Sequence, residues 1–194
     1  MAEYIPTNYM PSYLFKSERL GFRKWTPDDL APFAAMNADP EVMRYFPAVL
    51  SQDETQGLMD RINKHQEEET FCFYAVDRLE NEEFIGFIGL SRPKFEADFT
   101  PCVEIGWRLK ASVWRRGYAT EGALKCLEVA FDELGNEEIY SFTAHSNFPS
   151  YKVMEKIGMK KVGEFIHPKI GPDHPLNPHV LYKISKEEFE KIRK

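Results

Sequence analysis

The pattern of apolar and polar residues predicts strands in several parts of the chain. It is clearest over residues 102–109, where apolar residues take every second position, as in a strand with one buried face. That face carries Val103, Ile105, Trp107 and Leu109. The opposite face carries Glu104, Gly106 and Arg108. Apolar runs predict further strands at residues 19–25, 70–78, 83–91, 138–144, 160–166 and 179–184. Gly86 and Gly89, inside one of these runs, indicate a bulge or a close approach of two backbones.

Apolar residues spaced by three and four positions predict a long helix that starts near residue 118. Its repeating positions are Leu124, Leu127, Phe131 and Leu134, and Gly135 is expected to end it. Capping residues predict four more helices, at residues 26–37, 51–68, 146–158 and 185–194, which start near Thr26, Ser51, Asn147 and Ser185. Residues 39–46 are expected to form a short helical turn.

The order of these elements predicts the fold class. Strands that follow one another directly over residues 70–109 favour antiparallel pairing, and the strand–helix–strand unit through residues 118–134 favours a parallel pair. The expected class is α/β in the mixed α+β sense, with helices on both faces of one sheet. Neither a repeat nor a linker divides the sequence, so we expect a single domain over residues 1–194. Two prolines and several tyrosines in residues 1–18 predict a loose N-terminal arm.

Composition narrows the classes of partner. The formal net charge is −6, which disfavours nucleic acid as the main partner because nucleic acid is bound through a basic surface. Cys72, Cys102 and Cys126 are far apart and form no C-x-x-C pair, which is typical of reduced core residues in a cytoplasmic protein. Neither a signal-peptide pattern nor a run of eighteen apolar residues occurs in the sequence, so we expect no membrane association.

Residues 113–121 (VWRRGYATE) place two arginines and a glycine at the start of the predicted long helix. The first turn of a helix presents unpaired N–H groups and a partial positive charge, and so attracts anions. Gly117 lets the backbone approach a ligand closely, and no Ser, Asp or Asn stands just before Ala119 to cap the helix. We therefore expect this turn to bind a phosphorylated ligand. The alternative is a solvated arginine pair beside an ordinary turn glycine.

Several segments, taken in order, resemble the GNAT acetyltransferase superfamily. Residues 114–119 follow its pattern [QR]-x-x-G-x-[GA], except that Trp114 replaces Gln or Arg. Residues 147–159 (NFPSYKVMEKIGM) match its second pattern, N-x-x-[AS]-x-x-[LV]-x-x-x-x-G-[FM]. The opening segments RLGFRKW, TPDDL and PEVMRYF and the closing segment HPLNPHVLYKI are most similar to the branch of ribosomal-protein N-terminal (alanine) acetyltransferases. The resemblance covers most of residues 17–185.

This resemblance implies a mostly antiparallel sheet of six to seven strands, splayed at one parallel pair formed by residues 102–109 and 138–144. Acetyl-CoA is expected in the splay as co-substrate, with no metal. The implied contacts to its pantetheine and pyrophosphate are Ile105, Trp107, Leu109, Arg115, Arg116, Gly117, Tyr118, Ala119, Thr120 and Asn147. The implied reaction is direct transfer of the acetyl group to a primary amine in a ternary complex. The amine belongs to a small molecule or a protein N-terminus, and the acidic balance mildly favours a cationic one. Relatives are often monomers or homodimers.

Two residues are candidates for proton handling. An amine acceptor is mostly protonated at pH 7, so a base must remove a proton. Glu104 is the first candidate base, and its alternatives are an ion pair with Arg108 or a solvated strand position. Many family members place a tyrosine near the leaving thiolate, but Met154 stands at that position here and cannot donate. Ser150 is expected to stabilise the thiolate by a hydrogen bond, unless its hydroxyl only bonds the backbone of the first helical turn. Tyr151 is expected to point elsewhere.

Three positions are candidates for the acceptor site: Tyr45, Phe46 and His179. Aromatic residues at such places are more often part of the core, and a lone histidine is more often structural. His145, at the end of a strand beside the cofactor, and His174, in the last loop, carry the same alternatives. Two other functions stay open at this point. One is a regulatory module that binds CoA without catalysis, which Met154 in the tyrosine position keeps open, and the other is an interaction domain without a CoA site.

Overall fold

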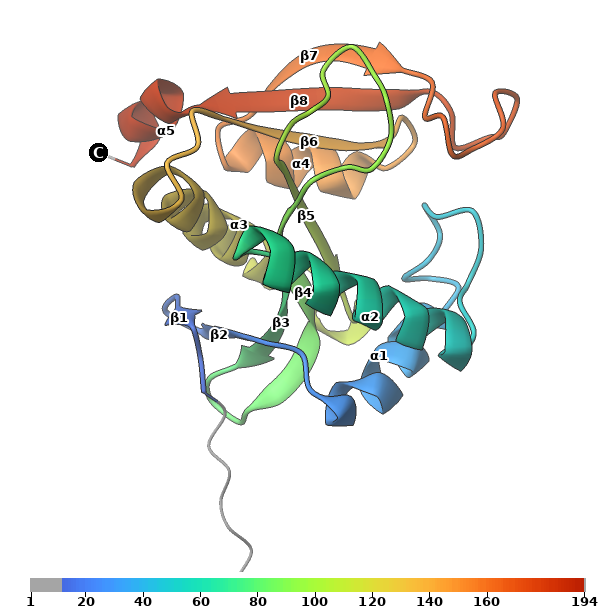
Figure 1. Cartoon of the computed structure of the whole chain (residues 1–194), viewed down its shortest axis with the longest axis vertical. Coiled ribbons are helices and arrows are strands. Elements are labelled where there is room, and N and C mark those ends of the chain that lie inside the picture. The colour runs from blue at the N-terminus through green and yellow to red at the C-terminus, as the bar shows by residue number, and fades with distance from the viewer. Residues whose placement is uncertain (1–11, 194) are drawn as a thin grey trace, which may run out of the picture.

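The computed structural model describes residues 12–193 and shows one eight-stranded sheet (Figure 1). Its strands are β1 (Phe15–Lys16), β2 (Leu20–Arg23), β3 (Phe73–Arg78), β4 (Glu83–Ser91), β5 (Glu104–Leu109), β6 (Glu138–Ala144), β7 (Lys160–Phe165) and β8 (His179–Ser185). They lie in the order β1-β2-β3-β4-β5-β6-β8-β7. Only β5 and β6 are parallel, and every other neighbouring pair of these strands is antiparallel. The predicted mixed, mostly antiparallel sheet is therefore confirmed.

The sheet has one more strand than the expected six to seven, because β1 lies in the segment that was predicted to be a loose arm. Phe15 and Lys16 pair with Phe22 and Gly21 of β2. The Phe15 ring stacks on Phe22 with 4.6 Å between centroids and meets the edge of Tyr74 at 4.9 Å. Apolar burial of this phenylalanine thus orders the second part of the arm. Residues 1–11 lie outside the described part of the chain.

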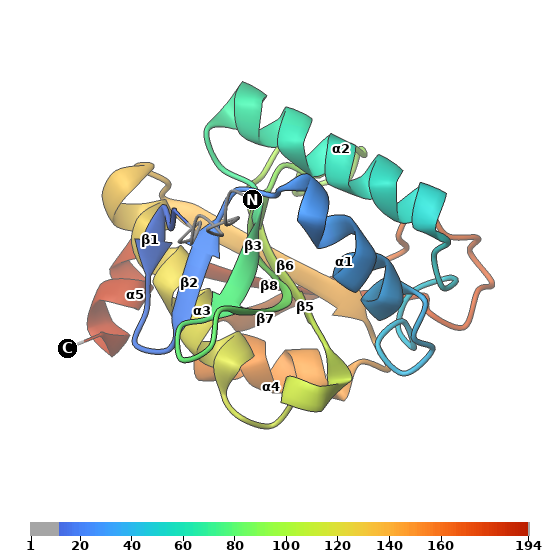
Figure 2. The same cartoon turned by 90° about the horizontal axis from the view of Figure 1, so that it is seen from below.

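Helices cover both faces of the sheet, as predicted. Their bounds are α1 (Leu30–Asn37), α2 (Gln52–Glu69), α3 (Tyr118–Glu128), α4 (Phe148–Lys156) and α5 (Lys186–Ile192). Figure 2 shows α1 and α2 on one face and α3 and α4 on the other. Residues 39–46 form only hydrogen-bonded turns, in which Met43 N–H donates to the Asp39 carbonyl at 3.0 Å, so the expected helical turn does not grow into a helix.

The helix ends follow the residues that the sequence marks. Ser51 and Ser185 accept hydrogen bonds at 3.2 Å from the N–H groups of Glu54 and Glu188, which caps α2 and α5. α3 continues into a wider turn over residues 129–133, and Gly135 follows with φ of 68°. That positive φ is left-handed backbone, which glycine adopts without strain.

The two glycines of β4 allow neighbouring backbones to approach, as predicted. A Cβ atom on Gly86 would lie 2.2 Å from the Arg108 carbonyl oxygen, and one on Gly89 would lie 2.1 Å from that of Cys72. The register between β3 and β4 shifts opposite this segment, between Val76 and Asp77, as in a β-bulge. β4 therefore packs closely against β3 on one side and β5 on the other.

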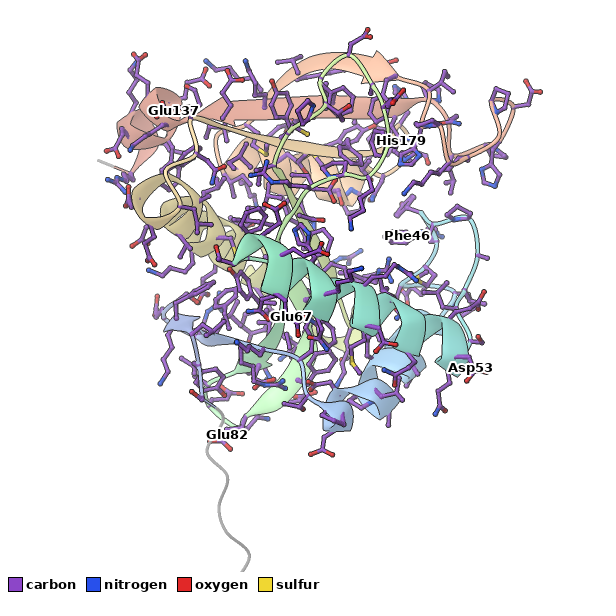
Figure 3. All side chains as sticks on the ribbon, viewed as in Figure 1. Phe46, Asp53, Glu67, Glu82, Glu137 and His179 are labelled. Atoms are coloured by element: carbon purple, nitrogen blue, oxygen red, sulfur yellow. The ribbon has the colours of Figure 1, made fainter. Side chains whose placement is uncertain are left out.

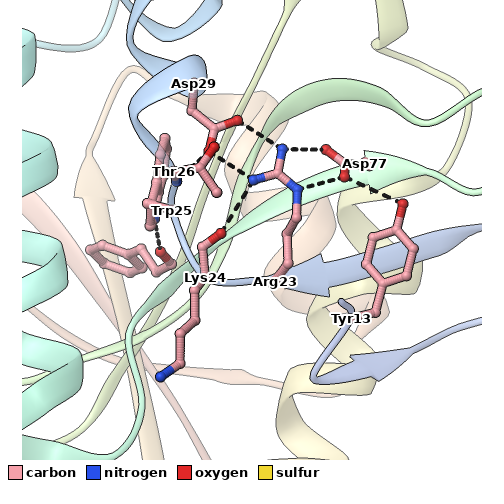
Figure 4. Close-up of polar contacts among 8 residues, drawn as sticks. Tyr13, Arg23, Lys24, Trp25, Thr26, Asp29 and Asp77 are labelled. Atoms are coloured by element: carbon pink, nitrogen blue, oxygen red, sulfur yellow. Dashed lines mark hydrogen bonds and ion pairs between the residues drawn. The ribbon is translucent and has the colours of Figure 1, made fainter. Parts of the chain in front are cut away.

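A buried ion network joins β2, β3 and the start of α1 (Figure 4). The Arg23 guanidinium donates to both carboxylate oxygens of Asp29, at 2.7 Å each, and to both of Asp77, at 2.6 and 2.9 Å. Tyr13 donates to Asp77 at 3.3 Å. Burial, and then the charge of Asp77, raise the pKa of Tyr13 to about 12, so its hydroxyl stays protonated. The network holds the N-terminal segment to the body of the sheet.

Three further observations concern the cysteines, the helices and the metal-ligand side chains of the described residues. Cys72, Cys102 and Cys126 are buried free thiols, as expected. Over residues 12–193, no helix combines the length and apolar character that a membrane crossing requires. Within the same range, no group of three or more His, Cys, Asp or Glu side chains is placed to hold a metal ion.

Candidate active site

The two parallel strands meet at one point and then separate (Figure 1). Their pairing is limited to Glu104 of β5 and Tyr140 of β6. Tyr140 N–H donates to the Val103 carbonyl at 2.9 Å. One step further, the hydroxyl of Ser141 donates to the Ile105 carbonyl at 2.9 Å, and no further backbone pair follows. The strands therefore splay toward their carboxyl ends, where α3 and α4 begin.

The backbone N–H and carbonyl groups of every second residue of β5 point toward this gap. Leu90 N–H donates to the Cys72 carbonyl, so Leu90 faces β3, and its neighbours in β4 face β5. By register, the alternate β4 residues Ser91, Gly89 and Phe87 pair with Glu104, Gly106 and Arg108. The backbone groups of the alternate residues therefore point toward β6: Ile105, Trp107 and Leu109. Beyond the last bridge, the N–H and carbonyl of Trp107 face the opening between the strands.

The turn before α3 has the geometry of an anion site. Gly117 is the N-cap with φ of 84°, and no side chain caps the helix. Arg115 also has a positive φ, of 60°. Arg115 and Arg116 are exposed and form no ion pair with any residue of the range 12–193. First-turn N–H groups without a side-chain cap, beside two free cations, suit a phosphate ligand.

Trp114 and Tyr118 have structural roles that the sequence did not show. Trp114 Nε1 donates to the Leu109 carbonyl at 2.8 Å, so this side chain holds the turn against the end of β5. The Tyr118 ring is buried in the core, and the Arg19 guanidinium lies 4.6 Å above it. Only the backbone of Tyr118 faces the turn. Ala119 and Thr120 follow in the first turn of α3, partly exposed.

Arg19 and Glu121 support the same turn, and the sequence analysis missed both. Arg19 Nε donates to Glu121 at 2.6 Å, and its Nη1 donates to the Arg116 carbonyl at 3.1 Å. The two residues are separated by 102 positions. An acidic residue in the first turn of a helix is a general stabilising pattern, so only the pairing of β1, β2 and α3 in space identifies its partner.

A second polar group lies at the start of α4. Asn147 Nδ2 donates to the hydroxyls of Thr143, at 2.8 Å, and Ser150, at 3.1 Å, while its Oδ1 accepts from Ser150 N–H at 3.4 Å. Asn147 thus caps α4, as predicted, and holds the Ser150 hydroxyl at the carboxyl end of β6. The sequence analysis did not include Thr143 or Ser141, because polar residues within a strand pattern gave no sign of their partners.

The neighbours of Ser150 point away from this group. Tyr151 donates to the His145 carbonyl, and its ring lies 6.0 Å from that of Tyr182, so it points elsewhere, as expected. Met154 is only 1% exposed and belongs to the core. His145 is exposed beside Glu164, at 3.8 Å. Of this set, Ser150 alone brings a side-chain donor next to Asn147.

Glu104 lies on the face of β5 that α1 and α2 cover, together with Gly106 and Arg108. It forms no ion pair with Arg108, which instead donates from Nη1 to Asn37 Oδ1 at 2.7 Å. Glu104 is partly buried. Burial raises the pKa of Glu104 to about 8, and the positive charge of Lys169 offsets a small part of that shift. Such a carboxylate accepts protons efficiently near neutral pH.

Two of the acceptor candidates, Phe46 and His179, lie on the same side of the molecule (Figure 3). Phe46 projects from the loop after α1, is 37% exposed and stacks on Arg108 with 4.0 Å from the guanidinium carbon to the ring centroid. Tyr45 is partly buried beside it.

His179 is only 7% exposed, with its ring 4.9 Å from that of His167. Burial, and then His167, lower the pKa of His179 to about 4, so it is neutral at pH 7. His174 lies in the last loop and donates N–H to the Gly171 carbonyl.

A comparison of the sequence with models of protein families identifies the family of this chain. The model of the acetyltransferase (GNAT) domain matches residues 19–160, which include β5, α3, β6 and α4. The chain belongs to the GNAT acetyltransferase family. It is therefore an acyltransferase, and its splayed strands and α3 turn lie within the matched residues. The resemblance stated from the sequence is confirmed at the level of the superfamily.

Individual relatives agree with this assignment. An uncharacterized N-acetyltransferase of Bacillus subtilis, YnaD, is 31% identical over 150 residues, which cover 77% of this chain and 84% of that protein. A GNAT-family acetyltransferase from Bacillus anthracis is 28% identical, with a TM-score of 0.75 over 89% of this chain and 98% of that one. A spermidine N-acetyltransferase from Vibrio cholerae, solved with CoA and spermine, has a TM-score of 0.70 at 19% identity over 89% and 98% of the two chains, and shares the fold.

Proposed function

We propose that this GNAT protein transfers the acetyl group of acetyl-CoA to a primary amine by direct attack within a ternary complex. The observation that carries the proposal is the splay between β5 and β6. It opens beside the uncapped start of α3, and Glu104 lies on the strand that borders it. A phosphate site, a strand with free backbone groups and a carboxylate of raised pKa are the three parts that the reaction requires.

The residues present fit the CoA part of the donor. N–H groups of the turn from Arg115 to Ala119, with the two exposed arginines, would hold the pyrophosphate. The Trp107 carbonyl, which faces the gap, would accept a hydrogen bond from an amide of the pantetheine, as in a neighbouring strand, and Asn147 lies on the other side of the gap. The co-crystallised CoA of the Vibrio cholerae spermidine N-acetyltransferase, which shares this fold, supports a CoA donor.

The reaction follows from the roles of three residues. The nitrogen of the acceptor attacks the acetyl carbon, so that a C–N bond forms and the C–S bond breaks. Trp107 N–H is placed to stabilise negative charge on the acyl oxygen. Glu104 takes the proton that the nitrogen loses. Ser150 donates a hydrogen bond to the leaving thiolate, since Met154 cannot. The acceptor is a small-molecule amine or a protein N-terminus, and relatives named as N-acetyltransferases support an amine.

The donor site is tested by replacing Gly117 with glutamate. At 100-fold its Kd, acetyl-CoA should stabilise the wild type by about 2.7 kcal/mol. For a domain of this size the melting temperature should rise by about 5–11 °C. A carboxylate at residue 117 repels the pyrophosphate, so the variant should show no shift. The measurement is a melting curve with and without acetyl-CoA, followed by thiol release with a panel of amines.

Gly135→Glu is the matched control. Gly135 also has a positive φ, at the other end of the same helix, and a side chain there meets nothing within 4 Å. It therefore adds the same backbone strain and charge away from the site, and should keep the full shift. A wild type without any shift would contradict the donor assignment. A full shift in Gly117→Glu would contradict the role of the turn. CoA binding without thiol release for any amine would favour a regulatory CoA-binding module.

Ser150→Ala should lower kcat by about ten- to a hundredfold, because a hydrogen bond to a charged leaving group is worth about 1.5–3 kcal/mol. KM for acetyl-CoA should change little, since the bond strengthens only as the thiolate forms. Steady-state kinetics provide the measurement, with the exposed neighbour Ser146→Ala as control. Equal kcat values for Ser150→Ala and Ser146→Ala would assign Ser150 a capping role alone.

A further inference from the structure

Arg108 is a half-buried cation without an acidic partner among residues 12–193. Its Nη1 donates to the amide oxygen of Asn37 at 2.7 Å. Its guanidinium carbon lies 4.0 Å from the ring centroid of Phe46 and 5.4 Å from that of Phe87. These contacts orient the guanidinium, but a neutral amide and two aromatic rings do not balance its charge. Burial lowers the pKa of Arg108 to about 10, which still leaves it positively charged at pH 7.

Part of the guanidinium is left without a hydrogen bond. Nε is sealed from solvent and has no partner among the described residues. Nη2 also donates to no described residue, but unlike Nε it is accessible to solvent. Arginine offers its donors in a rigid planar fork that matches carboxylate and phosphate oxygens. The open Nη2 edge is therefore suited to a ligand anion.

Arg108 shares its strand face with the candidate base. Glu104 and Arg108 are four residues apart on β5, so their Cα atoms are separated by about 13 Å along the strand. Between them Gly106 contributes no side chain, and the ring of Phe73 packs over its Cα. The loop that carries Phe46 borders Arg108 on the other side. An acceptor whose amine is close to Glu104 thus extends along an aromatic surface toward a cation.

We propose that Arg108 binds an anionic group of the acceptor, so that the preferred acceptor is a primary amine that also carries a carboxylate. This inference rests on the proposed acetyl transfer to an amine and specifies its substrate class. The net charge of the chain suggested a cationic acceptor, but the charged side chain at this end of the strand face is the cation Arg108. A polyamine would place a second ammonium near Arg108 at a cost in repulsion.

The experiment compares acceptors that differ only in their carboxylate. Diglycine and triglycine are tested beside their C-terminal amides, in which the amine is unaltered and the negative charge is removed. The wild type should show a higher kcat/KM for each acid than for its amide. Arg108→Gln should reduce the ratio of acid to amide by about ten- to a hundredfold, through KM, as expected for one charge-assisted hydrogen bond. Arg108→Lys should recover part of the ratio.

Arg44→Gln is the matched control, because Arg44 is an exposed cation two positions from Phe46. It should leave the ratio within about twofold of the wild type, which separates a bound carboxylate from general charge steering. If Arg108→Gln lowers kcat/KM equally for acids and amides, Arg108 only supports the loop that carries Phe46, and the proposal is overturned. A wild type that prefers spermidine or the amides overturns it as well.

A binding measurement keeps this test separate from the proposed reaction. With CoA present, triglycine should raise the melting temperature of the wild type more than triglycinamide does, and Arg108→Gln should abolish the difference. If no amine is acetylated but this difference is seen, the proposed reaction fails and the anion site stands. If amines are acetylated but acid and amide stabilise equally, the anion site fails and the reaction stands.

Discussion

Replacing Glu104 with glutamine is expected to lower kcat/KM by about 10²–10⁴-fold, the usual contribution of a positioned general base. Burial raises the pKa of Glu104 to about 8, so the wild type should gain activity as the pH rises and the carboxylate ionises. The variant cannot ionise at residue 104, so its profile should lack the bend near pH 8. The measurement is the pH dependence of kcat/KM for both proteins with one acceptor whose amine pKa lies well above 8, so that a bend near pH 8 belongs to the enzyme.

Glu104→Gln should also change how the free energy of unfolding depends on pH. Glu104 is expected to hold its proton up to about pH 8 when folded, but only to its ordinary pKa of 4.5 when unfolded. Between these values the native state binds more protons, so stability falls as the pH rises. The wild type should therefore lose stability relative to Glu104→Gln between about pH 5 and pH 8 in urea unfolding. Glu67→Gln, an exposed change on α2, should alter neither profile. Equal activity of the wild type and Glu104→Gln would remove Glu104 from the mechanism.

Replacing Arg23 with methionine is expected to destabilise the fold by about 3–5 kcal/mol, because it leaves the carboxylates of Asp29 and Asp77 buried without their cation. For this chain length the melting temperature should fall by about 6–20 °C. Methionine keeps much of the length of the arginine stem, so the loss of the four hydrogen bonds dominates the result. Thermal unfolding followed by circular dichroism provides the measurement.

Arg92→Met is the control for this prediction. Arg92 also pairs with a carboxylate, Glu69, at 2.7 Å, but its side chain is 43% exposed. Solvent screens such a pair, so the change should cost no more than about 1 kcal/mol. Similar losses in Arg23→Met and Arg92→Met would show that burial of the network adds nothing to its strength.

The site was predictable to different degrees. The exposed, uncapped helix start at Gly117 could be predicted, because glycine freedom and the lack of a capping residue are local properties of consecutive residues. Asn147 could be predicted as the α4 cap for the same reason. Arg19 could not be predicted, because its contact with Glu121 depends on how β1, β2 and α3 pack. The burial that raises the pKa of Glu104 also comes from elements far away in sequence.

The sequence by itself determined most of the elements, since alternation, three-and-four spacing and capping residues act within a few positions. It also determined the family, through patterns at residues 114–119 and 147–159. Only the tertiary structure decided that β1 joins the sheet, that β5 and β6 part after a single bridge, and that Arg108 lies against Asn37 and Phe46 rather than Glu104. These features depend on contacts between distant segments, whose free energies are set by burial and charge in the assembled fold.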